Sequence, residues 1–424
     1  MKRWISFLAT VALGACGGGG GGSASDAAPA GGTSGGGGEG GEPMTGGSTG
    51  DAGPTPDVGM VDPGPLPTLR AVSGDLTFVE RFRPGDATTG HLYSIQTDGK
   101  LRQRLTSAPG AWGNHAVGPD KRYIAAIRFR TPEGADSEDA PGEVWLIDVK
   151  THDEYAISPR GCDARHGGIG WRDEVQLMFS ASCDGQPSAV YLAARDDRTR
   201  DLAHLLQIPA GDEPVSEVFP AVGTSVFAYV AEHSICAGGD CFVKPQIWVA
   251  DADSEVRCQV TDGDLGFDEL ASFTDAPPPR LGDHTPAFSV DLSSLTFARN
   301  VGTKPGGPWG HLDPFRIGID LGALYGGRPT CAEPGSLTDL TARLVTDDYP
   351  ADGGGTAPAS EWQPQLATAG GLLSGGLLYV ARREGFGVAY YVDRMGTRTT
   401  LSDPAGEAVS ARWITDRFDT SGVR

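Results

Sequence analysis

Val-Trp-Leu-Ile-Asp at residues 144–148 is an alternating apolar segment that ends in an acidic residue and leads into a turn. Similar segments occur six times along the chain. Each has an apolar residue, usually an aromatic one, with alternating apolar positions, and often ends in Asp. The copies lie at residues 92–95, 144–148, 190–193, 247–251, 316–320 and 389–393. One such unit cannot bury its own apolar face. Its repetition at intervals of several tens of residues therefore predicts a closed array whose neighbours cover each other.

Short strands and tight turns flank most copies of the phrase. A turn such as Gly-Pro-Asp-Lys at 118–121 and an apolar strand such as 123–127 come before it. Another turn, such as Asp-Gly-Lys at 98–100, and a fourth strand, such as 101–106, come after it. This alternation is typical of antiparallel strands, four per unit, and patterns with a helical period are nearly absent. The sequence therefore predicts an all-β fold.

The units resemble the WD40-like (PD40) repeats of the TolB-type β-propeller, whose first turn reads Trp-Ser-Pro-Asp-Gly and whose last strand tends to end in Leu-Thr. No unit keeps the whole phrase, but four fragments occur: Pro119-Asp120, Phe288-Ser289, Leu105-Thr106 and Val260-Thr261. The resemblance covers about residues 72–416 and implies a fold rather than an activity, because such propellers serve many roles. TolB-like proteins also have a separate N-terminal domain. Here a Gly-rich segment stands in its place, so the role of TolB in the envelope complex is not implied.

The two ends of the repeat region predict how the ring closes. The first unit begins at residues 75–78 without an innermost strand, whereas residues 408–414 form a strand with no unit after it. Joining the two completes a sixth blade and removes an open edge that would invite aggregation. We therefore predict a six-bladed β-propeller in which N- and C-terminal strands close one blade and Trp413 packs between blades.

The N-terminus has the features of an export signal. Lys2 and Arg3 precede an apolar run at residues 4–13 that is too short to cross a bilayer. Leu-Gly-Ala-Cys at 13–16 resembles the lipobox of bacterial lipoproteins, which implies a signal peptide over 1–15 and lipid attachment to Cys16. An ordinary secretory signal is the alternative. Gly17, rather than Asp, follows the cysteine, which favours the outer membrane and leaves the periplasmic or surface side open.

A low-complexity segment separates this signal from the repeats. Residues 17–67 contain no aromatic residue and no Lys or Arg, so they cannot bury enough apolar area to offset the entropy of ordering. We predict a disordered Gly/Ser/Pro-rich tether over 16–67 with a reach of roughly 40 Å. The propeller is then expected over 68–416 and a C-terminal tail over 417–424.

The charge of the chain excludes two classes of partner. The formal net charge is −21, and removal of Lys2 and Arg3 with the signal would leave 32 basic residues against 55 acidic ones. Nucleic acids and anionic lipid surfaces both select positive protein surfaces, so neither is expected to bind electrostatically. The acidic charge either contributes to the recognition of a partner or only keeps an exported protein soluble.

The cysteines agree with export. Seven are present, and lipidation of Cys16 leaves six, an even number for an oxidising compartment. Six cysteines allow fifteen pairings. The repeat map narrows these by placing pairs in the same or neighbouring loops and blades: Cys236 with Cys241, Cys162 with Cys183, and Cys258 with Cys331.

Long loops gather on one predicted face. Loops between second and third strands and loops between blades emerge on the same side, which we call the loop-rich face. Seven long inserts fall there: 131–142, 183–188, 209–216, 233–245, 263–283, 302–314 and 347–360. Only 321–336 is a long excursion on the other side. Variable loops on a rigid scaffold usually carry binding sites. This face also has three acidic clusters: Glu133, Asp136, Glu138 and Asp139; Asp264, Asp268 and Glu269; Asp347, Asp348 and Asp352.

Five residues are predicted to approach the channel mouth on this face. His166 and His284 each stand seven residues before an Asp, at the start of innermost strands. Glu217 and Glu361 begin their strands at nearly the same level, and Trp362 follows. Two His and two carboxylates around one axis could bind a divalent metal. However, such channels commonly hold only ordered water, so we expect no cofactor and keep the metal as an alternative.

The expected function is that of a lipid-anchored, monomeric binding or scaffold protein of the cell envelope, acting without catalysis through its loop-rich acidic face. The partner would be an envelope protein or a glycan. No α/β domain follows the propeller as it does in prolyl-oligopeptidase-like enzymes, which disfavours serine hydrolysis. The alternatives are a channel-site hydrolase or lyase and a metal- or glycan-binding propeller.

Overall fold

The computed structural model describes Leu66 and residues 68–130, 141–164, 168–237, 240–262, 282–300, 312–340, 361–367, 376–383, 386–403 and 405–414. The chain divides into two compact units, Met1–Asp62 and Pro63–Arg424, and all described residues belong to the second. Within the described part, no helix is long and apolar enough to span a membrane.

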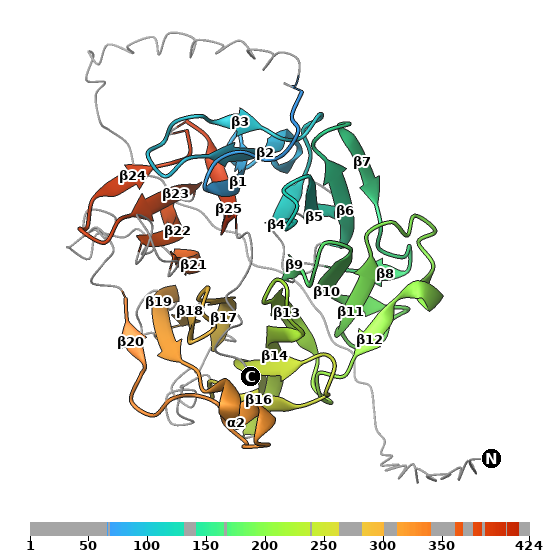
Figure 1. The fold of residues 1–424 in the computed structure, drawn as a ribbon, viewed down its shortest axis with the longest axis vertical. Coiled ribbons are helices and arrows are strands. Elements are labelled where there is room, and N and C mark those ends of the chain that lie inside the picture. Colours follow the sequence, from blue (N-terminus) through green and yellow to red (C-terminus); the bar gives the residue numbers. More distant parts are fainter. Residues whose placement is uncertain are drawn as a thin grey trace, which may run out of the picture. The chain divides into compact units, whose positions relative to one another are not determined.

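The described residues of the second unit form six antiparallel sheets, or blades, around a central axis (Figure 1). In the order from the innermost strand outward, blade 1 comprises β4 (Trp112–Val117), β5 (Tyr123–Phe129), β6 (Gly142–Asp148) and β7 (Asp153–Ala156). Blade 2 comprises β9 (Ile169–Trp171), β10 (Gln176–Cys183), β11 (Ala189–Ala194) and β12 (Leu206–Ile208), with β8 (Cys162–Asp163) also paired to β10. Blade 3 comprises β13 (Val215–Pro220), β14 (Val226–Ala237), β15 (Asp240–Asp251) and β16 (Arg257–Gln259).

The other three blades follow the same plan. Blade 4 comprises β17 (Asp283–Phe288), β18 (Ser294–Asn300), β19 (Leu312–Gly318) and β20 (Thr338–Asp339). Blade 5 comprises β21 (Glu361–Ala367), β22 (Gly376–Arg383), β23 (Phe386–Val392) and β24 (Arg398–Thr400). Blade 6 comprises β25 (Glu407–Trp413), β1 (Leu76–Arg81), β2 (Gly90–Ile95) and β3 (Gln103–Arg104). The short helices are η1 (Ala87–Thr89), η3 (Leu202–His204) and α2 (Leu321–Tyr325).

The final Asp of the repeated phrase has a local structural role. A carboxylate oxygen of Asp148, Asp251 and Asp393 accepts a hydrogen bond from the backbone N–H two residues later, at 3.0, 2.8 and 2.8 Å respectively. Such Asp-centred turns reverse the chain after the third strand and lead it into the fourth. The recurrence of Asp in the sequence therefore reflects turn formation.

The predicted closure of the ring is confirmed. β25 pairs with β1 in antiparallel register from Leu76 opposite Trp413 to Arg81 opposite Glu407, so the C-terminal strand completes the blade that the N-terminal strands begin. The Trp413 ring meets the ring of Tyr391 in blade 5 edge-on, with centroids 5.8 Å apart. Trp413 therefore packs between blades, as the sequence predicted.

The apolar core lies between the blades. Each of six buried clusters joins residues of neighbouring blades or of a blade and the connection before it. Between blades 1 and 2, for example, Ile127 and Leu146 share a cluster with Trp171 and Phe179. Burial of one large apolar side chain contributes roughly 1.5–3 kcal/mol, so each blade depends on both of its neighbours.

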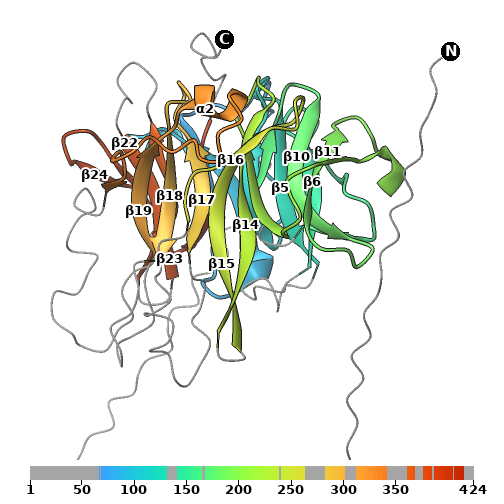
Figure 2. The ribbon, with the colours of Figure 1, turned by 90° about the horizontal axis from the view of Figure 1, so that it is seen from below.

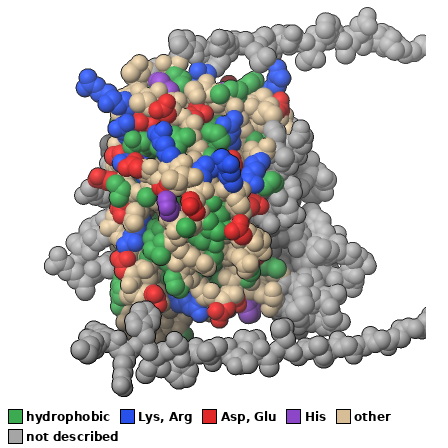
Figure 3. Space-filling view, turned by 90° about the vertical axis from the view of Figure 1, so that its right-hand side faces the viewer, with side chains coloured by type: hydrophobic (Ala, Val, Ile, Leu, Met, Phe, Trp, Pro, Cys, Tyr) green, Lys and Arg blue, Asp and Glu red, His purple; other side chains and the backbone are tan. Residues whose placement is uncertain are grey.

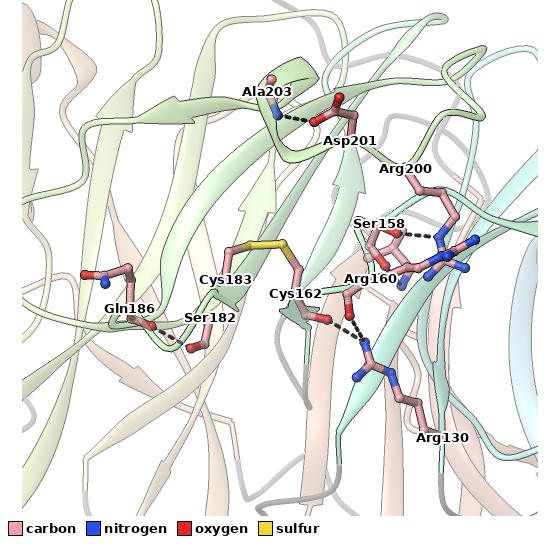
Figure 4. Close-up of a disulfide and its surroundings, with 11 residues drawn as sticks. Arg130, Ser158, Arg160, Cys162, Ser182, Cys183, Gln186, Arg200, Asp201 and Ala203 are labelled. Atoms are coloured by element: carbon pink, nitrogen blue, oxygen red, sulfur yellow. Dashed lines mark hydrogen bonds between the residues drawn. A yellow bond between two sulfur atoms is a disulfide. The ribbon is translucent and has the colours of Figure 1, made fainter.

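Two of the three predicted disulfides are confirmed. Cys162 in β8 is bonded to Cys183 at the end of β10, with 4.0 Å between the α-carbons (Figure 4). Cys258 in β16 is bonded to Cys331, with 5.6 Å between the α-carbons, and this bond links blade 3 to blade 4. The backbones of Cys236 and Cys241 face each other in the β14–β15 hairpin. The side chains of this third pair lie outside the described set, so their bond stays a prediction.

The two faces of the ring differ, as Figure 2 shows for the described elements. The far end of the β14–β15 hairpin and η1 project on one side, and α2 lies on the other. Both the hairpin turn and η1 connect second to third strands, so they mark the loop-rich face. α2 falls within 321–336, the insert that we expected on the opposite face.

Candidate functional site

The innermost strands carry bulges that shape the channel. β4, β13, β17 and β21 each shift register near their first residues, and the β25–β1 pair shifts within the strand. A bulge bends the strand and changes the direction of the side chains beside it. Because these strands start at the loop-rich face, the bulges direct polar residues toward the mouth of the channel.

Two predicted site residues meet at this mouth. His284 Nδ1 of β17 lies 3.5 Å from Glu217 Oε1 of β13, and both side chains are about nine-tenths buried. The backbone N–H of Thr285 donates to Glu217 Oε2 at 2.6 Å. Thr285 has a φ of 50°, a backbone conformation that non-glycine residues rarely adopt, and it stands at the β17 bulge. The bulge therefore brings the carboxylate of blade 3 to blade 4.

Arg412 of β25 is a third ionisable group of the channel, and the sequence reasoning missed it. Its guanidinium lies 4.5 Å from the centroid of the Phe219 ring, and its Nη2 donates to Asn114 Oδ1 at 3.5 Å. Burial lowers the pKa of Arg412 to about 10, and the Glu217 carboxylate opposes this shift. The carboxylate from blade 3 thus stabilises a cation contributed by the closing strand.

His115 of β4 is close enough to Arg412 to feel its charge, and it has a structural role. Its Nδ1 lies 3.0 Å from Ser410 Oγ and its Nε2 lies 2.9 Å from Thr77 Oγ1. Because Ser410 donates its own proton to the Gly113 carbonyl, Nδ1 donates to Ser410 and Nε2 accepts from Thr77. Burial, with the positive charge of Arg412, lowers the pKa of His115 to about 3. The imidazole is therefore neutral at pH 7 and ties β4 to β25 and β1.

An ion pair between Asp283 and Arg299 holds the start of β17. Asp283, directly before His284, accepts two hydrogen bonds from Arg299, at 2.7 Å from Nε and 2.9 Å from Nη2. The Arg299 guanidinium also stacks near the rings of Phe297 and Phe315, at 5.3 and 5.4 Å from their centroids. This two-point, aromatic-backed pair fixes the start of β17 and hence the position of His284.

The remaining predicted site residues are only partly described. The backbones of Glu361 and Trp362 begin β21 opposite Ala381 and Val380, at the expected level, but their side chains are outside the described set. His166 and the three acidic clusters also lie outside the described residues. Among the side chains that are described, no group of three or more His, Cys, Asp or Glu could hold a metal ion. The metal alternative therefore stays a prediction that depends on His166 and Glu361.

The chemistry of the mouth suits binding. A carboxylate, an imidazole, an amide and a guanidinium come from blades 3, 4, 1 and 6, and all four side chains are buried. Each is held by neighbouring backbone or side-chain groups, so a ligand would meet donors and acceptors that are already oriented. Asn114 and Arg412 carried no sequence signal of their own beyond their places on innermost strands.

The architecture defines the class of this protein as a six-bladed β-propeller. No protein-family model matches the chain, and no curated protein matches it. Solved structures do match. TolB from Acinetobacter baumannii is 16% identical, with 80% of this chain and 66% of that chain covered and a TM-score of 0.49. A putative TolB from Agrobacterium tumefaciens is 11% identical, with 81% and 99% covered and a TM-score of 0.42.

A third match is the hydrazine synthase of Kuenenia stuttgartiensis. It is 11% identical, with 82% of this chain and 48% of that chain covered and a TM-score of 0.50. At such identity the likeness concerns the fold alone. The chain spans about half the length of this enzyme and about two thirds of the Acinetobacter TolB chain.

Proposed function

We propose that this protein is a lipid-anchored β-propeller of the bacterial cell envelope that binds an envelope protein or a glycan, without catalysis, through its loop-rich face at the channel mouth. The observation that carries the proposal is the convergence of Asn114, Glu217, His284 and Arg412 from four blades. A rigid ring that presents buried, oriented polar groups at the base of long loops is the arrangement of a recognition site.

The disulfides support export. Disulfides form and persist in oxidising compartments, and both described ones cross-link parts of the propeller that the repeat map placed together. Together with the lipobox-like sequence before Cys16, they favour the envelope over the cytoplasm. The tether over 16–67 would hold the ring away from the lipid surface.

The outer edge of the ring has a mixed surface, which favours recognition at the loop-rich face over recognition at the edge. Figure 3 shows Lys and Arg side chains interspersed with acidic and apolar ones on the side drawn there. A mixed surface of this kind keeps a protein soluble and offers no single-sign field to a partner. The repeats predict that the acidic clusters lie instead on loops of the loop-rich face, outside the described residues.

The anchor is tested by replacing its cysteine. Cys16→Ala should move the protein from the membrane fraction to the soluble envelope fraction, because the lipid is attached to that thiol. The propeller itself should keep its melting temperature. Unchanged membrane association of the variant would contradict the lipoprotein assignment.

The binding role is tested by cross-linking in intact cells followed by capture of the full-length chain. Glu217→Gln should reduce recovery of the cross-linked partner relative to the wild type. Asp98→Asn is the matched control, because Asp98 lies in the β2–β3 turn on the opposite face and pairs only with nearby Lys100 among the described residues. Equal recovery from both variants would contradict recognition at the channel mouth. Metal found stoichiometrically in the purified protein would favour the metal-binding alternative.

A further inference from the structure

A separate cavity opens on the loop-rich face between blades 6 and 1. Its volume is about 500 Å³, within the range of small-molecule sites. Its lining includes Thr88 from η1, Gly110 from the connection between the blades, and Arg128, Arg130, Glu143 and Trp145 from β5 and β6 or their ends. None of these residues belongs to the channel mouth.

The guanidinium of Arg128 is held in place by aromatic rings. It lies 5.1 Å from the centroid of the Trp112 ring and 4.8 Å from that of Trp145, and the two indoles meet edge-on at 6.3 Å. Contact with two rings fixes the guanidinium without using its hydrogen-bond donors. Among the residues that the structure describes, the Arg128 side chain has no hydrogen bond and no ion pair.

Further donors surround the same space. A β-carbon built on Gly110 would lie 3.1 Å from Arg128 Nε, 3.3 Å from Arg128 Nη2 and 3.2 Å from Trp112 Nε1. These three nitrogens therefore lie close together beside the backbone of Gly110, and a side chain at residue 110 would press against them. The buried Nε1 atoms of Trp112 and Trp145 have no hydrogen-bond acceptor within the described part of the chain. Buried donors are normally paired, so the indole nitrogen of Trp112 beside Gly110 lacks the acceptor that such an atom usually has.

Among the charged side chains that the structure describes, none compensates Arg128. Glu143 is the acidic lining residue, and it is already engaged: its Oε1 accepts from Arg200 Nη2 at 2.5 Å and lies 3.5 Å from Arg130 Nε. Arg130 also donates to the carbonyls of Arg160 and Cys162, at 3.2 and 2.8 Å (Figure 4). The cavity is thus cationic in a strongly acidic chain.

We propose that this cavity binds an organic carboxylate with an apolar body. The carboxylate would accept hydrogen bonds from the forked donors of Arg128 beside Gly110, a geometry that guanidinium groups favour. The apolar body would pack against the other lining side chains, which include Pro109, Ala111 and Phe129. The ligand is either a small carboxylic acid or the C-terminal carboxylate of a peptide, because both present the same group. This site is independent of the channel-mouth function proposed above.

The test is a titration of the full-length protein followed by tryptophan fluorescence and calorimetry. The probes are 3-phenylpropionate, its amide, and the peptide acetyl-Ala-Phe with either a free or an amidated C-terminus. We expect saturable binding of the free carboxylates. The amides should bind at least about tenfold more weakly than the acids, because a charged hydrogen bond is lost. Tighter binding of the free peptide than of 3-phenylpropionate assigns the site to chain ends. The reverse order assigns it to small acids.

Variants locate the site. Gly110→Ala fills the space between the donors and should abolish binding, and φ of Gly110 lies outside the left-handed range, so alanine is compatible with the backbone. Arg128→Lys keeps the charge but removes the fork and should weaken binding about tenfold. Arg257→Gln is the matched control, because Arg257 also stacks on a tryptophan, Trp248, at 5.6 Å, but in blade 3. Circular dichroism verifies folding of each variant. Equal binding of acids and amides, no binding of either acid, or unchanged binding to folded Gly110→Ala would overturn the proposal.

Discussion

Arg412 in the channel and Arg128 in the cavity between blades 6 and 1 both stack on aromatic rings, but they differ in what surrounds the charge. Arg412 is buried beside the carboxylate of Glu217, which stabilises its cation. Arg128 is half-buried at an open cavity and has no anionic partner among the described residues. In the channel a described carboxylate supplies the counter-charge, whereas at the cavity no described residue does, and we propose that a ligand supplies it. We therefore interpret Arg412, whose charge is paired within the protein, as part of the structural frame, and Arg128 as part of a ligand site.

The largest difference is expected in stability. Arg412→Met should lower the free energy of unfolding by about 3 kcal/mol, because it leaves Glu217 buried without its nearby cation. Arg128→Met should cost about 1 kcal/mol, since only the ring contacts are lost. Urea unfolding of both variants gives the two values. Equal losses would remove the distinction between the two arginines.

A smaller difference is expected in the response to pH. The pKa of His115 in the folded protein, about 3, lies below its ordinary value of 6.5, so the unfolded state binds more protons between these values. The stability that depends on neutral His115 is complete above pH 6.5 and is lost as the pH falls. The loss should reach about 2 kcal/mol at pH 5.

Denaturant titrations at pH 7.5 and pH 5 measure this loss. His115→Asn should show a smaller difference between the two pH values than the wild type. A residual difference is expected from His91, whose pKa is lowered to about 4, mainly by burial. An identical pH dependence of wild type and His115→Asn would show that the His115 imidazole is not held neutral.

The smallest effect concerns the cavity. At ten times its dissociation constant, 3-phenylpropionate should stabilise the wild type by about 1.4 kcal/mol, because it binds only the folded state. Arg128→Met should abolish this gain, and Arg412→Met should retain it despite its lower starting stability. Loss of the gain in both variants would mean that the two regions are not independent.

The fold was accessible from the sequence because its signals are local and repeated. Strand alternation, Asp-centred turns such as that of Asp148, and an orphan strand at each end suffice to predict blades and their closure. The same map placed Cys162 with Cys183 and Cys258 with Cys331, because loops of neighbouring blades are neighbours in space.

The sites were accessible only in part. His284 and Glu217 were found because both begin innermost strands, where position along the strand predicts proximity to the axis. Arg412 was missed because it stands near the end of its strand, whereas the sequence reasoning considered only the first residues of innermost strands. The cavity at Gly110 depends on contacts among η1, the connection between blades, and β5 and β6, which no local pattern encodes. One lining residue of the cavity could have been singled out from the sequence, because Trp145 occupies the aromatic position of the repeated phrase.

The central claim, that the loop-rich face meets a partner in the envelope, is tested most directly by photo-cross-linking in living cells. A photoreactive phenylalanine analogue replaces either Val243, near the tip of the β14–β15 hairpin, or Met395, in the β23–β24 turn on the opposite face. Both side chains are exposed and apolar, which makes the positions comparable. The account predicts a discrete cross-linked species from position 243 and none from position 395. A species from position 395 alone would contradict it.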